Sequence, residues 1–321
     1  VIKGCSSGTN AESLAAAIRH LQPVALSIFY GEPCSTVPVY KRPKNPAKNW
    51  NPVGNFEVSL TPRNHMISAP SDRKLFLVDA FALVFRAYYA FIKNPRINSK
   101  GLNTSAIFGF TNALLDVIRK EKPTHIAVVF DPPGGSFRSV QYPDYKANRD
   151  ETPEDIKRSV PWIMEVLEGM NIPAISQKGF EADDVIGYMS KKAEEQGFEV
   201  YMMTPDKDFG QLVTERVKMY RPGRGGGPAE VWGPTEICEK FGVDNPLQVI
   251  DLLGMMGDSA DNIPGIPGIG EKTSKILIGK YGSVEGLIEH AHELKGKQKE
   301  NVINFAEQGL MSKRLATILL D

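Results

Sequence analysis

Acidic side chains gather in two short segments of the stretch 179–210, which reads GFEADDVIGYMSKKAEEQGFEVYMMTPDKDFG. The carboxylates of the two segments are Glu181, Asp183, Asp184, Asp206 and Asp208. Carboxylates packed this closely must either be protonated or be neutralised by cations, because like charges in a small volume repel one another. The stretch therefore predicts a site that binds cations.

The elements around these acids are expected to bring the two segments together. Residues 174–176 (AIS) and 198–204 (FEVYMMT) have the composition of short buried strands. Between them, Val185, Met189 and Ala193 recur at fourfold spacing, which predicts a helix. Because a strand, a helix and a parallel strand return the chain to the same edge of the sheet, both acidic segments should lie at that edge.

Two apolar runs upstream also end on an aspartate. KLFLVDA leads to Asp79 and HIAVVFD to Asp131, and the later loop GDSADN adds Asp258 and Asp261. Oxygen ligands without His or Cys favour Mg²⁺ or Mn²⁺ over zinc, and nine carboxylates suffice for two ions and phosphoryl chemistry. Helix capping or solvent exposure explains any single aspartate equally well. The pattern shared by four strand ends favours the metal site.

The composition is that of a soluble globular protein with about two domains. The chain has 321 residues, 41% of them apolar, and we expect no association with a membrane. Cys5, Cys34 and Cys238 have neither metal-site spacing nor a disulfide framework, so a reducing compartment is expected. The formal charge is zero, but the chain becomes basic on balance if the nine acids bind metal ions, which suits a polyanionic partner.

Residues 1–65 differ in composition from the rest of the chain. They contain seven prolines, six asparagines and no aspartate. The run KRPKNPAKNWNP resembles a basic tail, but a Pro- and Asn-rich segment is more typical of disorder. We predict a disordered leader or an upstream extension and assign it no function.

A basic segment, 132–160, follows Asp131. Its basic residues are Arg138, Lys146, Arg149, Lys157 and Arg158, and they alternate with the aromatic residues Phe137, Tyr142 and Tyr145. Such interleaving suits a single nucleic-acid strand. A solvated loop before a helix with Thr152 as N-cap and Pro153 at its first position explains the same residues. The position after a proposed metal ligand favours contact with a substrate.

One more basic residue, Arg86, lies in the apolar helix expected after Asp79. A phosphate contact and a solvent-directed side chain explain it equally well.

A glycine-rich segment, PGIPGIGEKTSK, follows the last two acids. Its backbone can form a tight turn that approaches a phosphate, and the following helix adds its dipole. The residues of this anion site are Gly265, Gly268, Gly270, Lys272, Thr273 and Lys275. Such a turn often only links two helices, but the acids before it and the KT pair after it favour a hairpin that grips a duplex backbone without reading bases.

Six motifs together resemble the 5′ nuclease (flap endonuclease) family, especially the amino-terminal 5′→3′ exonuclease domains of bacterial DNA polymerase I. The motifs occur in the family's order over residues 72–320: LVDAFALVFRAYYA, VVFDPPGGSFR, YPDYKANR, GFEADDVIG, TPDKDFGQL and GDSADNIPGIPGIGEKT. The resemblance implies an α/β fold, a PIN-like parallel-sheet core with a helical arch, followed by an α-helical helix-hairpin-helix (H3TH) module. The expected division is a leader at 1–65, a core at 66–230 with the arch at about 132–160, and the module at 231–321.

The resemblance also implies roles for single residues. The first metal would be surrounded by Asp79, Asp131, Glu181 and Asp183. The second would be surrounded by Asp206, Asp208, Asp258 and Asp261, with Asp183 or Asp184 between the two ions. Lys146 and Arg149 would contact the scissile phosphate, and Arg86 and Tyr145 would help to place the strand. Ala80 departs from the family pattern, which has glycine after the first aspartate, and the GRGGG loop is longer than in several relatives; both leave the ligands intact.

The implied activity is metal-dependent hydrolysis of DNA phosphodiesters at a free 5′ end or a 5′ flap. It would use two Mg²⁺ ions, for which Mn²⁺ can substitute, and the H3TH module often holds K⁺ in the family. The implied setting is a monomer in the bacterial cytoplasm, acting at the nucleoid, with a polymerase domain in the full-length protein. Two alternatives stay open: a catalytically inactive, structure-specific DNA-binding module, and a PIN-type ribonuclease.

Overall fold

The computed structural model describes residues 73–223 and 227–321, so the leader expected for residues 1–65 lies outside the described residues. The described chain forms two compact units. Unit 1 consists of 73–133, 152–203 and 319–321, and unit 2 of 134–151 and 204–318 without the undescribed 224–226. The division expected between residues 230 and 231 therefore falls inside unit 2.

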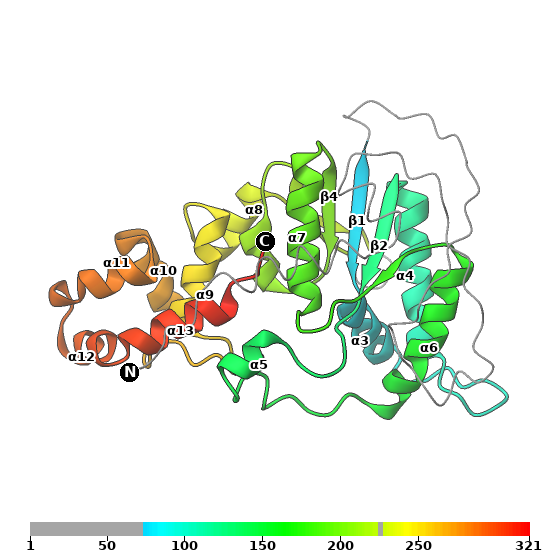
Figure 1. Cartoon of the computed structure of the whole chain (residues 1–321), viewed down its shortest axis with the longest axis horizontal. Helices are drawn as coiled ribbons and strands as arrows, with labels where there is room; N and C mark the ends of the chain where they lie inside the picture. Colours follow the sequence, from blue (N-terminus) through cyan, green and yellow to red (C-terminus); the bar gives the residue numbers. More distant parts are fainter. Residues whose placement is uncertain (1–72, 224–226) are drawn as a thin grey trace, which may run out of the picture. The chain divides into compact units, whose positions relative to one another are not determined.

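Unit 1 is built on parallel strands (Figure 1). In sheet order they are β3 (Ala174–Ile175), β2 (His125–Val129), β1 (Lys74–Asp79) and β4 (Glu199–Met203). The register pairs Asp79 with Val129, and Val78 with Met203. The predicted set of four parallel strands that end at one edge is therefore confirmed.

Helices connect these strands. They are α3 (Ala80–Ala90), α4 (Ser105–Glu121), α6 (Glu154–Gly169) and α7 (Ala182–Glu195). Helix α7 contacts β1, β2 and β4, whereas α3, α4 and α6 contact one another. As the fourfold spacing predicts, Val185, Met189 and Ala193 of α7 are buried. Burial of an apolar side chain of the size of Val185 or Met189 stabilises the fold by roughly 1.5–3 kcal/mol, so packing against the sheet fixes the start of α7.

Unit 2 combines an antiparallel strand pair with short helices. The strands are β5 (Val217–Arg221) and β6 (Glu230–Trp232). The helices are α5 (Phe137–Gln141), α8 (Pro234–Phe241), α9 (Val249–Met256), α10 (Glu271–Tyr281), α11 (Val284–Glu289), α12 (Gly296–Asn304) and α13 (Ala306–Ala316). Three 3₁₀ turns join them: η2 (Lys207–Leu212), η3 (Pro246–Gln248) and η4 (Ala291–Glu293).

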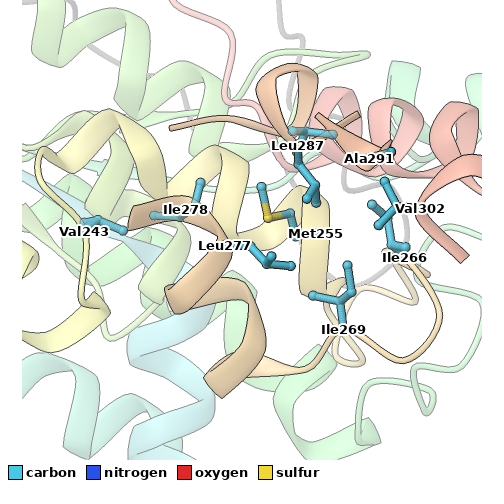
Figure 2. Close-up of a cluster of buried hydrophobic side chains, with 10 residues drawn as sticks. Val243, Met255, Ile266, Ile269, Leu277, Ile278, Leu287, Ala291 and Val302 are labelled. Atoms are coloured by element: carbon cyan, nitrogen blue, oxygen red, sulfur yellow. The ribbon is translucent and has the colours of Figure 1, made fainter. Parts of the chain in front are cut away.

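A cluster of buried apolar side chains holds the helical part of unit 2 together (Figure 2). Its members are Val243, Met255, Ile266, Ile269, Leu277, Ile278, Val284, Leu287, Ala291 and Val302. Ile266 and Ile269 belong to the glycine-rich segment between α9 and α10, and they are only 1% and 4% exposed. The hairpin is therefore anchored in the core by its isoleucines, which leaves its glycines to form the turn.

The segment expected to form a helical arch, 132–160, is helical only in part. Helix α5 covers Phe137–Gln141, and α6 begins at Glu154. The N-cap of α6 is Pro153, without a side-chain cap bond, so the expectation of Thr152 as N-cap is wrong by one residue. No helix in the described part of the chain is both long enough and apolar enough to cross a membrane.

Two acidic clusters as candidate metal centres

The unit 1 cluster comprises the predicted ligands Asp79, Asp131, Glu181, Asp183 and Asp184. Asp79 ends β1 and caps α3, since its Oδ1 accepts from the Ala82 N–H at 3.0 Å. Asp131 follows β2, and its Oδ1 accepts from the Ala182 N–H, the first residue of α7, at 2.9 Å. The ends of β1 and β2 and the start of α7 therefore lie close together, as predicted. Positive helix ends face these carboxylates and favour their charge.

The two neighbouring aspartates at the start of α7 differ in environment. Asp184 is fully buried, and both its oxygens accept backbone N–H bonds, from Glu181 at 3.1 Å and from Leu319 at 3.0 Å. Asp183 is half-buried and Glu181 is the N-cap of α7. The structure thus gives Asp184 a structural role in capping α7 and fixing residue 319. Asp183 and Glu181 are the better candidates for a metal ion.

Arg86 lies on α3, seven residues after Asp79, and is half-buried. Seven residues are about two helical turns, so Arg86 is on the same side of α3 as its N-cap aspartate. This position is compatible with the predicted phosphate contact.

The unit 2 cluster comprises Asp206, Asp208, Asp258 and Asp261. Two of its members, Asp258 and Asp261, lie on the acid loop, which we define as residues 257–265. The backbones of Gly257 and Gly265 approach each other so closely that a Cβ on Gly265 would lie 2.3 Å from the Gly257 nitrogen. Inside the loop, Asp258 and Ile263 exchange two backbone hydrogen bonds of 2.9 and 2.7 Å. The acid loop is therefore a closed, internally bonded structure.

The other two members precede and enter η2. Asp206 is the N-cap of η2 and accepts from the Asp208 N–H at 3.0 Å, whereas Asp208 is 8% exposed. Among the described residues, no donor reaches Asp208 Oδ1. Burial, together with the nearby charge of Asp206, raises the pKa of Asp208 well above its usual value. Burial also raises the pKa of Asp206, against the hydrogen bond from the Asp208 N–H.

Basic side chains neutralise the acid loop in this structure. Lys146 Nζ lies 3.6 Å from Asp261 Oδ2, Arg149 donates to Asp261 Oδ1, and the Tyr145 hydroxyl donates to Asp261 Oδ2 at 3.0 Å. Burial alone would raise the pKa of Asp261, but Lys146 and Arg149 hold it below its usual value. The predicted phosphate-binding residues and a predicted metal ligand are thus direct neighbours within unit 2.

Backbone and amide contacts fix this arrangement. The Lys146 N–H donates to the Asp261 carbonyl at 2.9 Å, and Lys146 adopts a positive φ of 57°. Asn148 donates to the Ser259 carbonyl and Asn262 to the Asp144 carbonyl, both at 2.7 Å. Residues 144–149 are therefore attached to the acid loop along their whole length.

The side chains of the unit 2 cluster are of the chemical type that a hard divalent cation prefers. Its ligands are carboxylates only, and the buried Asp208 Oδ1 has an acceptor position that a cation can fill. Within residues 73–223 and 227–321, no group of three or more His, Cys, Asp or Glu side chains is close enough to form a complete metal site. A cation at this cluster would have to compete with the bases that now face Asp258 and Asp261.

Arg138, for which a DNA contact is predicted, is buried and bound to the end of a helix. Arg138 is 2% exposed, and its guanidinium donates to the carbonyls of Leu315 and Thr317 at 2.9 and 2.7 Å. These carbonyls belong to the C-terminal end of α13, where a cation is favourable. Tyr145 is also buried, with 6% exposure, and its hydroxyl donates to Asp261.

The glycine hairpin separates into internal and outward-facing parts. The Gly265 N–H donates to Ser312 Oγ at 3.0 Å and its carbonyl accepts from Gln308, so this glycine is used within the fold. Gly268 has a φ of 80°, and Gly270 is the N-cap of α10, whose first turn has N–H groups without helical partners.

The polar residues after the hairpin also differ in accessibility. Lys272 is exposed and Thr273 half-buried, whereas Lys275 is paired with Glu271 at 2.8 Å. The exposed residues of the predicted anion site are therefore Gly268, Gly270 and Lys272.

One residue beside the unit 2 cluster was not predicted from the sequence. Lys207 stands between Asp206 and Asp208, and its Nζ donates to Asp258 Oδ2 at 2.6 Å. The sequence signal for this residue is a lysine between two predicted metal ligands in the TPDKDFGQL motif. Its partner, 51 positions away, is visible only in the structure.

The chain matches known protein families along most of its length. Residues 74–242 match the family described as 5′-3′ exonuclease, N-terminal resolvase-like domain. Residues 244–321 match the family described as 5′-3′ exonuclease, C-terminal SAM fold. Residues 1–42 match a family described only as a protein of unknown function.

Curated relatives extend beyond this chain. DNA polymerase I of Bacillus subtilis is 42% identical over 251 residues, which are 78% of this chain and 28% of the relative. DNA polymerase I of Mycobacterium tuberculosis is 40% identical over 234 residues, 72% of this chain and 26% of the relative. The chain thus spans between a quarter and a third of the length of these relatives.

Solved structures share the fold. The 5′-exonuclease of phage T5 with bound divalent zinc ions has a TM-score of 0.62 and 25% identity, and the match covers 76% of this chain and 89% of that one. The T5 flap endonuclease in a pseudo-enzyme–product complex with DNA and metal ions has a TM-score of 0.61, 25% identity and the same coverage. With both halves of the described chain matched in sequence and fold, this chain belongs to the 5′-3′ exonuclease family.

Proposed function

We propose that this chain is a structure-specific 5′→3′ exonuclease and flap endonuclease that hydrolyses DNA phosphodiesters. The observation that carries the proposal is the unit 2 cluster, in which the buried Asp208 Oδ1 has no donor and another member, Asp261, pairs with the basic residues Lys146 and Arg149. Structural cores do not need such a charge cluster, because an unneutralised buried charge is destabilising. Family membership supports the same activity.

Each unit would hold one divalent ion, and Mg²⁺, with Mn²⁺ as a substitute, suits the oxygen ligands. In unit 1 the ligands would be Asp79, Asp131, Glu181 and Asp183. In unit 2 they would be Asp206, Asp208, Asp258 and Asp261. When bound, the ions would lower the pKa of a water molecule and stabilise charge on phosphate oxygens. The zinc ions in one T5 structure support the proposed divalent metal ions, and the DNA in the other supports the proposed substrate.

The remaining site residues would bind and orient DNA. Lys146 and Arg149, which now pair with Asp261, would offset negative charge on the scissile phosphate, and Arg86 would contact a phosphate near unit 1. Gly268, Gly270 and Lys272 of the hairpin would hold the duplex backbone without reading its sequence.

The proposal includes two finer points. A potassium ion at the hairpin would bind main-chain carbonyls, and those of Gly265 and Pro267 would share it with the amides of Gln308 and Asn301. The chain would act as a monomer on DNA with a free 5′ end or 5′ flap, as the 5′ nuclease part of a DNA polymerase I. The greater length of the curated relatives supports the second point.

A cleavage assay tests the function. A 5′-flap DNA duplex labelled at its 5′ end should be cut in Mg²⁺, and EDTA should abolish the cutting. The same flap in RNA and a blunt duplex serve as comparison substrates, with Asp208→Asn as the inactive control. Binding of the flap without cutting would support the inactive DNA-binding module, and preferred cutting of RNA would support the ribonuclease.

A further inference from the structure

A lysine forms an ion pair with a member of the unit 2 cluster. Lys207 is the first residue of η2, and its Nζ lies 2.6 Å from Asp258 Oδ2. The Asp258 side chain is 7% exposed, whereas that of Lys207 is 40% exposed. One partner of this ion pair is thus fixed in the fold, and the other reaches solvent.

Both carboxylate oxygens of Asp258 already accept a hydrogen bond. Oδ1 accepts from the Ala260 N–H at 2.8 Å, inside the acid loop, and Oδ2 accepts from Lys207. The first bond is part of the closed loop. Each carboxylate oxygen has two lone pairs, so a cation can bind either oxygen of Asp258 beside the existing bond. At Oδ2 it must share the oxygen with the ammonium or displace it, and at Oδ1 the ammonium on the other oxygen still repels it, because like charges at one carboxylate lie only a few ångströms apart.

Only a side-chain movement is needed for this exchange. A lysine side chain is a flexible stem with a strongly hydrated ammonium, so Lys207 can move into solvent without disturbing η2. The acid loop has no need to move, because its backbone bonds between Asp258 and Ile263 do not involve Lys207.

We propose that Lys207 is a positioning residue that sets the affinity of the unit 2 cluster for a divalent cation. It holds Asp258 in the metal-free protein and yields Oδ2 when a cation binds. The consequence is a weaker metal site in a protein that stays folded without metal. This inference rests on the proposed function, since it requires that the unit 2 cluster binds a metal ion.

Calorimetric titration of the full chain with MnCl₂ tests the inference. Lys207→Met retains most of the stem and removes the charge, so Mn²⁺ should bind the unit 2 cluster about three- to tenfold more tightly. The same variant should unfold at a lower temperature than wild type in EDTA and regain stability in Mn²⁺. Lys207→Arg retains the charge and should behave like the wild type in both measurements.

Two further variants make the outcome specific. Lys280→Met removes a lysine that also donates to a carboxylate, Glu293 Oε2 at 2.8 Å, but outside the cluster, and should leave the Mn²⁺ affinity unchanged. The Mn²⁺ binding event that is absent in Asp208→Asn is assigned to the unit 2 cluster. If this event is present in wild type and is unchanged or weaker in Lys207→Met, the role of Lys207 is refuted while the metal site stands. If wild type shows no such event, the metal assignment of unit 2 is refuted, and Lys207 with it.

Discussion

Two pairs of acids, Asp79 and Asp131 in unit 1 and Asp258 and Asp261 in unit 2, differ in the donors that bind them. In unit 1, backbone N–H groups at helix starts bind the carboxylates, as in the bonds from Ala82 to Asp79 and from Ala182 to Asp131. In unit 2, side-chain bases do so, as in the pairs of Asp258 with Lys207 and Asp261 with Lys146. Backbone donors are fixed by the fold, whereas side-chain bases can leave. The named bonds of unit 1 are therefore part of the backbone framework, whereas the named ion pairs of unit 2 can exchange by side-chain movement.

The largest expected effect concerns activity. Among the described residues of unit 2, no basic side chain donates a hydrogen bond to Asp206. Asp206→Ala removes this carboxylate and should reduce flap cleavage at least about a hundredfold. DNA affinity, measured by fluorescence anisotropy, should persist because the hairpin is untouched. Cleavage at the wild-type rate would remove Asp206 from the metal ligands.

The next effect tests whether the acid loop depends on its closed backbone. Gly265→Ala places a Cβ against the backbone of Gly257 at a φ of 63°, and it should lower the free energy of unfolding by roughly 2–4 kcal/mol. Gly279→Ala is the matched control, because Gly279 is helical and its Cβ would meet open space. This control should stabilise the protein by about 0.5–1 kcal/mol. Equal unfolding midpoints in urea for the two variants would contradict the loop description.

A third pair of variants separates the two clusters directly. Asp131→Ala removes the acceptor at the start of α7 and should destabilise the metal-free protein by about 0.5–2 kcal/mol. Asp208→Asn removes a buried charge that repels Asp206, and should instead stabilise the metal-free protein, by about 1 kcal/mol. Thermal unfolding in EDTA measures both. Changes of the same sign would show that the clusters are not neutralised differently.

The pH dependence of stability should follow from the same difference. Because the pKa of Asp208 is raised in the folded protein, the folded state binds a proton at pH values where the unfolded chain does not. Metal-free stability should therefore increase as the pH falls through that raised pKa toward the unfolded value of about 3.9. Asp261 has a lowered pKa and acts oppositely, so its contribution is lost at still lower pH. Thermal unfolding in EDTA across this range should show the increase in wild type and a smaller one in Asp208→Asn.

Local sequence patterns were sufficient to predict the unit 1 framework. The apolar run that ends at Asp79 forms β1, and the run that ends at Asp131 contains β2. The spacing of Val185 and Met189 predicts the buried face of α7. These features depend on neighbours in sequence, which periodicity reports. The ends of β1 and β2 therefore lie close to the positions that the sequence predicts.

Contacts between distant residues could not be predicted in this way. Arg138 bonds to carbonyls 177 and 179 positions away, and Asp184 to the N–H of a residue 135 positions away. The sequence does not reveal these contacts, because a charged residue in a motif is written the same way whether it faces solvent or the end of a helix. The pairing of Lys146 with Asp261 has the same origin.

The number of metal ions bound by the full chain tests the central claim most directly. Titration with Mn²⁺, followed by calorimetry, should detect two bound ions in wild type. One should be lost in Asp131→Asn and the other in Asp208→Asn. Binding that survives in both variants, or no binding in wild type, would contradict the assignment of one metal centre to each acidic cluster.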